Sequence, residues 1–172
     1  MVDLDTVLLR HLIELRRPWL DDVMLFASAL AGGGFIWWVT ALIASVFPDR
    51  RAAAWRLLLA IAFTFLLNDY AVKPFIDRPR PFDVLSGLQV IDAKPATSGF
   101  PSGHTAMAVA GAVAGSRLVT GAGWLLWPLG VLVAFSRVYV GVHWPSDVAG
   151  GVIVGLACGW FVLGGRAPAL RG

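Results

Sequence analysis

Three short stretches of this sequence carry side chains that could do acid–base or anion chemistry. KPFIDRPRP spans residues 73–81, FPSGHTAMA spans residues 100–108, and SRVYVGVHWPSD spans residues 136–147. Each stretch alone has an ordinary explanation, because an arginine at a helix end usually contacts solvent or lipid head groups. A histidine four residues before an aspartate is, by itself, usually a coincidence. Together, however, the stretches supply basic residues, histidines and an aspartate, which predicts one shared anion site.

The basic residues of these stretches are suited to binding phosphate. Arg80 and Arg137 offer fork-shaped sets of N–H donors that match phosphate oxygens, and Lys73 adds a compact positive charge. Charged side chains near a membrane are costly unless they are paired or functional. We therefore expect these three residues to hold a phosphate group.

The segment PSGH, residues 101–104, is expected to open a helix. Pro101 suits the first helical position, which would leave the backbone N–H groups of Ser102, Gly103 and His104 free. Free N–H groups at a helix start point at a bound anion with the helix dipole behind them. Gly103 has no side chain, so a phosphate could approach the backbone closely.

The two histidines divide naturally into a nucleophile and an acid. Asp147 follows His143 by four residues, and Pro145 between them marks the start of the last helix. The carboxylate can fold back to one imidazole nitrogen, which fixes the tautomer and leaves the other nitrogen free to attack phosphorus. His104 would then protonate the leaving oxygen as a general acid.

The composition of the chain predicts that this site lies at a membrane. The sequence has 172 residues, of which 58% are hydrophobic and 15% are charged, with a mean hydropathy of +0.73. Soluble domains are about 45–50% apolar and about 25% charged, so a compact soluble protein is excluded. Five apolar runs of near-spanning length follow one another, at residues 23–47, 52–72, 105–119, 124–142 and 148–164.

The expected fold is therefore an all-α, polytopic membrane bundle with about five transmembrane helices. Before the first run, LLRHLIELRR (residues 8–17) mixes charge and leucine at helical spacing, so residues 1–19 are expected to hold an amphipathic helix in the membrane interface. Fourfold spacing of glycines predicts close helix packing at Gly111, Gly115, Gly151, Gly155 and Gly159. Lipid-facing or interfacial anchoring is expected for Trp37, Trp38, Trp124 and Trp127.

The charges of the connections predict the orientation. Five spans put the N-terminus and the 73–104 and 137–147 connections on one side, and the 48–56 and 116–123 connections with the C-terminus on the other. The second side carries one acid, Asp49, against the arginines Arg50, Arg51, Arg56, Arg117, Arg166 and Arg171. Basic residues crowd cytoplasmic loops, so the predicted anion site faces away from the cytoplasm.

The pattern of the three stretches resembles that of a known family. Lys73, six residues, then Arg80-Pro81; Pro101-Ser102-Gly103-His104; and Ser136-Arg137, five residues, His143, three residues and Asp147 match the three-part signature of the type 2 phosphatidic acid phosphatase (PAP2) superfamily. The resemblance covers residues 73–147 and implies one PAP2-type domain over residues 1–172. Many membrane members of that family have six spans, so the expectation of five plus an interfacial helix departs from them.

The resemblance implies a reaction through a phosphohistidine that needs no metal ion and no other cofactor. It makes His143 the nucleophile, Asp147 its partner and His104 the acid for the leaving group. It assigns phosphate binding to Lys73, Arg80, Ser102, Gly103 and Arg137.

A site within a membrane predicts a lipid phosphate or diphosphate as substrate. The outward orientation favours undecaprenyl diphosphate, converted to undecaprenyl phosphate; phosphatidylglycerophosphate, phosphatidate and lipid A phosphates stay open as alternatives. A non-enzymatic membrane protein with a degenerate site and a vanadate-dependent oxidative enzyme are weaker alternatives. Residues 82–100 would form the lip of the site, with no head-group preference readable from them.

The expected partners are the lipid substrate and the bilayer, with no nucleic acid, and a homodimer stays open. Frequent arginine, alanine and glycine indicate a bacterium. The expected location is the bacterial inner membrane, with several spans and a site facing the periplasm or the cell exterior.

Overall fold

The computed structural model describes residues 3–118 and 123–164, and this part of the chain is helical and contains no strand. The helices are α1 (Leu4–Glu14), α2 (Pro18–Ala31), α3 (Phe35–Ser45), α4 (Arg51–Leu66), α5 (Lys73–Ile76), α6 (Pro81–Val84), α7 (Gly103–Gly115), α8 (Leu126–Tyr139) and α9 (Pro145–Val162). Two 3₁₀ turns, η1 (Gly32–Gly34) and η3 (Gly123–Leu125), and one π-helical segment, η2 (Leu67–Val72), complete the described elements. The predicted all-α class is confirmed.

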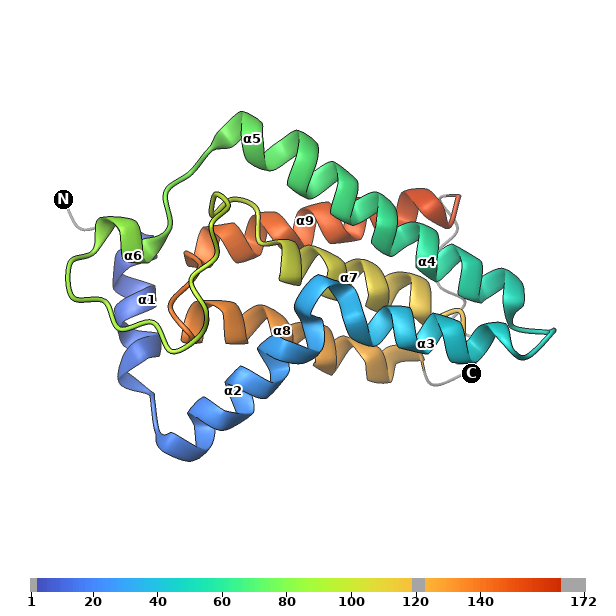
Figure 1. Ribbon diagram of the computed structural model, residues 1–172, viewed down its shortest axis with the longest axis horizontal. Coiled ribbons are helices and arrows are strands. Elements are labelled where there is room, and N and C mark those ends of the chain that lie inside the picture. The colour runs from blue at the N-terminus through green and yellow to red at the C-terminus, as the bar shows by residue number, and fades with distance from the viewer. Residues whose placement is uncertain (1–2, 119–122, 165–172) are drawn as a thin grey trace.

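Helix α7 is the centre of the bundle. It contacts α4, α8 and α9 along its length, and apart from His104 every residue from Gly103 to Gly115 is buried. Its small side chains, mostly alanine, glycine and valine, allow three neighbouring helices to approach at once. The helix that opens at the PSGH segment is thus held in place from several sides (Figure 1).

The predicted close packing at the glycines is confirmed on α7 and α9. A Cβ atom at Gly155 would lie 2.4 Å from the carbonyl oxygen of Ala106, and one at Gly151 would lie 2.6 Å from that of Ser102. Any larger residue at these positions would therefore force α9 away from α7. Because the site-bearing starts of the two helices adjoin, this contact also fixes the spacing of the site.

The prediction for Trp37 is wrong. Its side chain is buried in the core with only 2% exposed, and a Cβ atom at Gly111 would lie 2.2 Å from its ring. The indole thus fills the space that the glycine leaves on α7. The other three tryptophans of this prediction, Trp38, Trp124 and Trp127, are exposed on the apolar surface, as expected of lipid-facing or interfacial side chains.

Among the described residues, three helical stretches are long and apolar enough to cross a membrane: residues 18–45, 51–84 and 145–162. Residues 123–139 form a shorter apolar helix, and α7, with 13 residues, is shorter still. Helices occupy all five predicted runs, but only three have full spanning length. The first begins five residues earlier than Val23 and is interrupted at Gly33 and Gly34, whose φ angles of 57° and 75° are left-handed.

The second predicted run also continues further than expected. The run was predicted to end at residue 72, but the helix continues through η2 and α5 to Ile76 and includes Pro74. A proline is tolerated here because the π-helical segment before it breaks the regular pattern of backbone hydrogen bonds, and Pro74 then stands in a new first turn. The helix ends where Asp77 adopts a left-handed φ of 43°.

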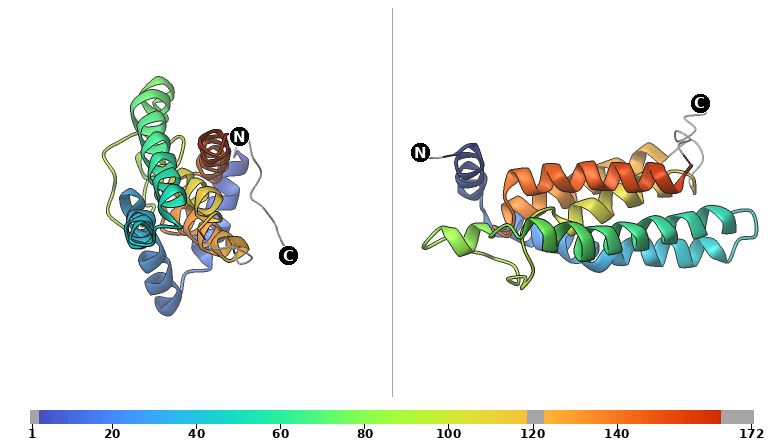
Figure 2. Two further views of the ribbon diagram at one scale, coloured as in Figure 1. Left: turned by 90° about the vertical axis from the view of Figure 1, so that its right-hand side faces the viewer. Right: turned by 90° about the horizontal axis from the view of Figure 1, so that it is seen from above.

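The two ends of the bundle differ in character. Helix α1 lies crosswise beyond one end, close to α6 and the turn between α8 and α9 (Figures 1 and 2). The α3–α4 turn lies at the opposite end from the connections between α6 and α7 and between α8 and α9, as the alternation of the helices predicted. The predicted N-terminal helix is confirmed, although it ends at Glu14, before Pro18 starts the next helix. Arg166 and Arg171, which entered the charge argument, lie outside the described residues.

Candidate active site

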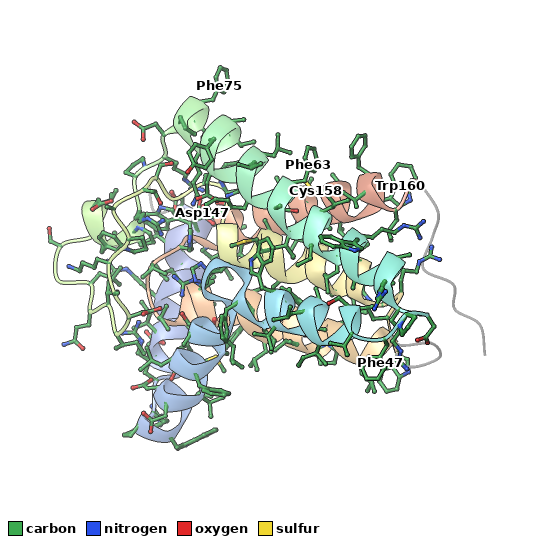
Figure 3. All side chains as sticks on the ribbon, turned by 45° about the vertical axis from the view of Figure 1, so that its right-hand side comes forward. Phe47, Phe63, Phe75, Asp147, Cys158 and Trp160 are labelled. Carbon is green, nitrogen blue, oxygen red and sulfur yellow. The ribbon has the colours of Figure 1, made fainter. Side chains whose placement is uncertain are left out.

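His143 and Asp147 form a buried pair at the turn between α8 and α9. The Nδ1 atom of His143 lies 3.4 Å from Oδ2 of Asp147, and both side chains are at most 2% exposed. The same Oδ2 accepts a hydrogen bond of 2.9 Å from the backbone N–H of Trp144, which caps the start of α9. The helix cap and the histidine contact thus use one carboxylate, as the four-residue spacing predicted. Figure 3 shows Asp147 on the side of the molecule opposite to Phe47 and Trp160.

The other nitrogen of His143 faces a cation. Its Nε2 atom lies 3.2 Å from Nη1 of Arg80. A proton on Nδ1, directed at Asp147, and a lone pair on Nε2, directed at Arg80, satisfy both contacts. Burial, followed by the positive charges of Arg80, Arg137 and Lys73, lowers the pKa of His143 well below its ordinary value. The imidazole is therefore neutral near neutral pH, which is the form a nucleophile requires.

Arg80 is held by backbone carbonyl groups. Its Nη1 donates to Val142 at 2.8 Å, its Nε to Thr97 at 2.7 Å and its Nη2 to Ser98 at 3.1 Å. The segment between α6 and α7 thus folds back around this guanidinium, which is 3% exposed. Carbonyl groups orient the fork without neutralising its charge, so the cation stays available to an anion.

Arg137, on α8, is paired with two residues that the sequence analysis did not identify. Its Nη1 donates to Oδ2 of Asp92 at 2.9 Å and also to the hydroxyl of Ser28 on α2. Burial alone would raise the pKa of Asp92, but hydrogen bonds from Ser28 and Ala93 and the charge of Arg137 lower it overall. Asp92 therefore stays ionised and occupies one side of the guanidinium.

Lys73, on α5, lies beside the start of α7. It is 7% exposed and its ammonium group is paired with Asp69, one turn earlier. A Cβ atom at Gly103 would lie 3.5 Å from Nζ of Lys73 and 3.3 Å from the side chains of Asn68 and Asp69. The glycine was predicted to let a phosphate approach, and it also lets these three side chains lie against the backbone of α7.

The start of α7 differs in part from the prediction. The first helical residue is Gly103, with Ser102 as the cap and Pro101 before it, so Pro101 is not in the first helical position. The hydroxyl of Ser102 accepts from the N–H of Thr105, and the N–H of Ser102 donates to the carbonyl of Asp147 at 3.0 Å. A helix cap must come directly before the first turn, which is why the serine, and not the proline, takes this position.

Ser102 is therefore tied to the pair at α9 and does not offer a free N–H, whereas Gly103 and His104 stand in the first turn. His104 is partly exposed, unlike the rest of α7. The positive charges of Arg137 and Lys73 disfavour the protonated form of His104 in the free protein. All eight residues predicted for the site thus gather at one end of the bundle.

The sequence analysis missed further charged residues next to this site. Arg78 lies inside the first motif and binds Asp147 through a 2.7 Å contact, and Asp69 and Asp92 pair with the predicted cations. Asp69 is one helical turn before Lys73, which is a signal that could have been read from spacing. Asp92 gives no such signal, because it lies 45 residues before its partner.

Two histidines, an aspartate and three cations at one end of an apolar helical bundle define a membrane protein with a site suited to a phosphate group. The PAP2 superfamily profile matches residues 53–168, and the chain belongs to this superfamily. The predicted resemblance is confirmed, and the chain is a multi-pass membrane protein of that family.

Proteins with similar sequences are named for different lipid substrates. An undecaprenyl-diphosphatase of Sulfolobus acidocaldarius is 33% identical over 79% of this chain and 66% of its own length. A lipid A 4'-phosphatase of Porphyromonas gingivalis is 32% identical over 73% of this chain and 59% of its own length. The chain thus spans somewhat less than two thirds of these relatives.

The solved crystal structure of Aquifex aeolicus LpxE has the same fold. It superposes with a TM-score of 0.83 at 29% identity, over 94% of this chain and 96% of that chain. The family and the fold are therefore established, whereas the relatives are named for different substrates.

Proposed function

We propose that this protein is a lipid phosphatase that works through a phosphohistidine. The observation that carries the proposal is the buried pair in which Asp147 holds Nδ1 of the neutral His143 while its Nε2 faces Arg80. We also infer that residues 1–172 act as one PAP2-type domain, because α1 contacts both α8 and α9.

The first step transfers the phosphoryl group to the enzyme. Nε2 of His143 attacks the terminal phosphorus, and the bond between that phosphorus and the leaving oxygen breaks. This is the bridging oxygen of a diphosphate or the ester oxygen of a monophosphate, and His104 gives its proton to it. The negative charge of a bound phosphate favours the protonated form of His104. Arg80, Arg137 and Lys73 hold the phosphate oxygens, together with the first-turn N–H groups at Gly103 and His104.

The second step restores the enzyme. Water attacks the phosphohistidine, His104 takes a proton from that water, and the bond between phosphorus and Nε2 breaks to release inorganic phosphate. Ser102 supports both steps as the cap of α7 and through its N–H bond to the carbonyl of Asp147. No step needs a metal ion, since the protein's own cations balance the phosphate charge.

We propose undecaprenyl diphosphate as the substrate, hydrolysed to undecaprenyl phosphate. The relative from Sulfolobus acidocaldarius carries that activity in its name. A second candidate is the removal of phosphate from lipid A, which the name of the Porphyromonas gingivalis relative favours, and a glycerophospholipid phosphate stays an alternative.

The site is proposed to face the periplasm or cell exterior from a bacterial inner membrane. The α3–α4 turn at the other end carries Arg50 and Arg51, and such basic turns mark the cytoplasmic face. Ser86 and Asp49, both exposed, lie in connections at the two ends. With Ser86→Cys, an impermeant thiol reagent should label intact cells, whereas Asp49→Cys should react only after lysis. The reverse result would contradict this orientation; Cys158 is buried and serves as the background.

The function is tested by phosphate release from the purified protein in detergent with EDTA present. The panel is undecaprenyl diphosphate, undecaprenyl phosphate, phosphatidylglycerophosphate, phosphatidate and lipid A. We expect rapid turnover of the diphosphate that His143→Ala abolishes. Preference for another lipid would move the assignment to the second candidate, and loss of activity in EDTA would contradict the metal-independent mechanism.

A further inference from the structure

An acidic residue of the N-terminal helix reaches the edge of the candidate site. Asp5, in the first turn of α1, accepts a 2.9 Å hydrogen bond from the backbone N–H of Ser146 through Oδ1. Its Oδ2 accepts from the hydroxyl of Ser146 and lies 2.7 Å from Nη2 of Arg78. Residues from three distant parts of the chain thus meet at one carboxylate.

The contacts continue from Asp5 to the histidine. Nη1 of Arg78 donates to Oδ1 of Asp147 at 2.7 Å and to the hydroxyl of Ser146 at 2.6 Å. Oδ2 of Asp147 is the atom that faces His143. Arg78 therefore holds one oxygen of Asp147 while the other orients the imidazole, and Asp5 holds Arg78 through its second terminal nitrogen, Nη2.

Helix α1 is fixed firmly enough to act in this way. Leu9 is fully buried and packs with Val138 and Trp144, on either side of the histidine turn. The indole N–H of Trp144 donates to the carbonyl of Pro79 at 3.0 Å, and the guanidinium of Arg78 lies 5.7 Å from the centre of that ring. The N-terminal helix, the first motif and the third motif thus form one packed unit.

We propose that Asp5 is a positioning residue for the phosphatase reaction: through Arg78 and Ser146 it holds Asp147, and through Asp147 the nucleophile His143. This inference rests on the proposed function. Arg78 is 29% exposed, so without Asp5 its guanidinium would be free to turn toward water and release Asp147. Burial alone would raise the pKa of Asp5, but hydrogen bonds from Ser146 and Arg78 lower it overall, so the carboxylate is charged at neutral pH.

The test compares Asp5→Asn with Asp3→Asn. Both variants remove one negative charge at the start of α1, but Asp3 only caps the helix through the N–H of Thr6, and asparagine caps equally well. We expect Asp5→Asn to lower kcat about tenfold, the lower end of what the loss of an outer supporting contact costs. KM should stay within about twofold of wild type, because the phosphate cations are untouched.

A double variant separates positioning from general loosening of the fold. If Asp5 acts through Arg78, adding Asp5→Asn to Arg78→Lys should lower kcat much less than it does in the wild type, since residues of one network are not additive. Thermal unfolding in detergent, measured on the same samples, should show that both single variants are fully folded at the assay temperature. Equal kcat losses in the two single variants, or additive losses in the double variant, would overturn the inference.

Hydrogen–deuterium exchange provides a readout that does not depend on turnover. The N–H groups of Trp144 and Ser146 bond to Asp147 and Asp5, so Asp5→Asn should speed exchange in peptides covering residues 143–148, and Asp3→Asn should not. A silent wild type on every lipid would refute the proposed function, and the exchange data would still decide this inference. Unchanged exchange in Asp5→Asn would refute it even in an active enzyme.

Discussion

The His143–Asp147 pair and the cations around it are stabilised in different ways. Asp147 is fully buried and held by Trp144 and Arg78, so its geometry is fixed by the protein alone. Lys73 and Arg137, by contrast, are each paired with an acid, Asp69 and Asp92. The pair therefore keeps one arrangement, whereas the carboxylates beside Lys73 and Arg137 lie where a bound phosphate could also contact these cations.

This difference indicates how the free site remains stable. Cations gathered in a buried place repel one another, and an uncompensated buried charge is strongly destabilising. Carboxylates next to Lys73 and Arg137 relieve that cost until an anion binds. Within the described part of the chain no acid pairs with the fork of Arg80. The fork instead donates to the carbonyls of Val142, Thr97 and Ser98, and its Nη1 lies next to His143.

The largest expected effect is at the fixed pair. His143→Ala removes the attacking nitrogen, so we expect kcat to fall by about 10⁴-fold or more, as when one member of a catalytic unit is removed. His11→Ala is the matched control, because His11 is exposed on α1 and contacts only the carbonyl of Val7 among its described hydrogen bonds. Phosphate release by both variants, with unfolding midpoints, is the measurement; substantial activity in His143→Ala would contradict the assignment of the nucleophile.

The second largest effect is expected at a cation. Arg137→Lys keeps the charge but loses the fork, so the rate should fall about 10²-fold, as for the loss of one donor that stabilises the transition state. Arg50→Lys, at the exposed far end, is the control. Measurement of kcat and KM for both variants tests this, and a near-normal Arg137→Lys would show that the fork is not used.

The pH dependence tests the neutral state of His143. Its lowered pKa means that it stays unprotonated as the pH falls through the ordinary value of 6.5. The kcat/KM ratio reports on the free enzyme. As the pH falls through 6.5 this ratio should therefore not decrease, and it should drop only at lower pH, when His143 gains a proton. Measurement between pH 4 and 8 decides this; a midpoint at or above 6.5 would contradict a buried, cation-surrounded nucleophile.

The smallest effect is expected at an acid that compensates a cation. Asp92→Asn removes the negative charge from Arg137, so KM should fall roughly threefold, in line with the value of a partly exposed ion pair, with kcat little changed. Asp49→Asn, in an exposed pair with Arg50, is the control. Measured KM values that rise in Asp92→Asn would show that Asp92 orients Arg137 for the phosphate and does not compete with it.

Much of the fold and the site follows from local sequence. The apolar runs predicted the helices, and the glycine spacing predicted the contact between α7 and α9, because each depends on residues close in the chain. The helix boundaries were predicted less accurately: the second run continues past residue 72 to Ile76, and Pro101 lies just before a helix and not in its first position. Trp37 was misplaced, because its partner Gly111 lies 74 residues away and nothing local distinguishes a core indole from an interfacial one.

The sequence by itself determined the chemistry of this protein: which residues are basic, which can transfer protons, and that His143 and Asp147 are spaced to pair across one helical start. Only the tertiary structure decided what lies next to those residues. Asp92 and Ser28 reach Arg137, and Asp5 reaches Arg78, from positions 45 to 109 residues away. Such contacts depend on how α1 packs against α8 and α9, how α2 packs against α8, and where the segment that carries Asp92 runs. Packing of that kind leaves no periodic signal in the chain.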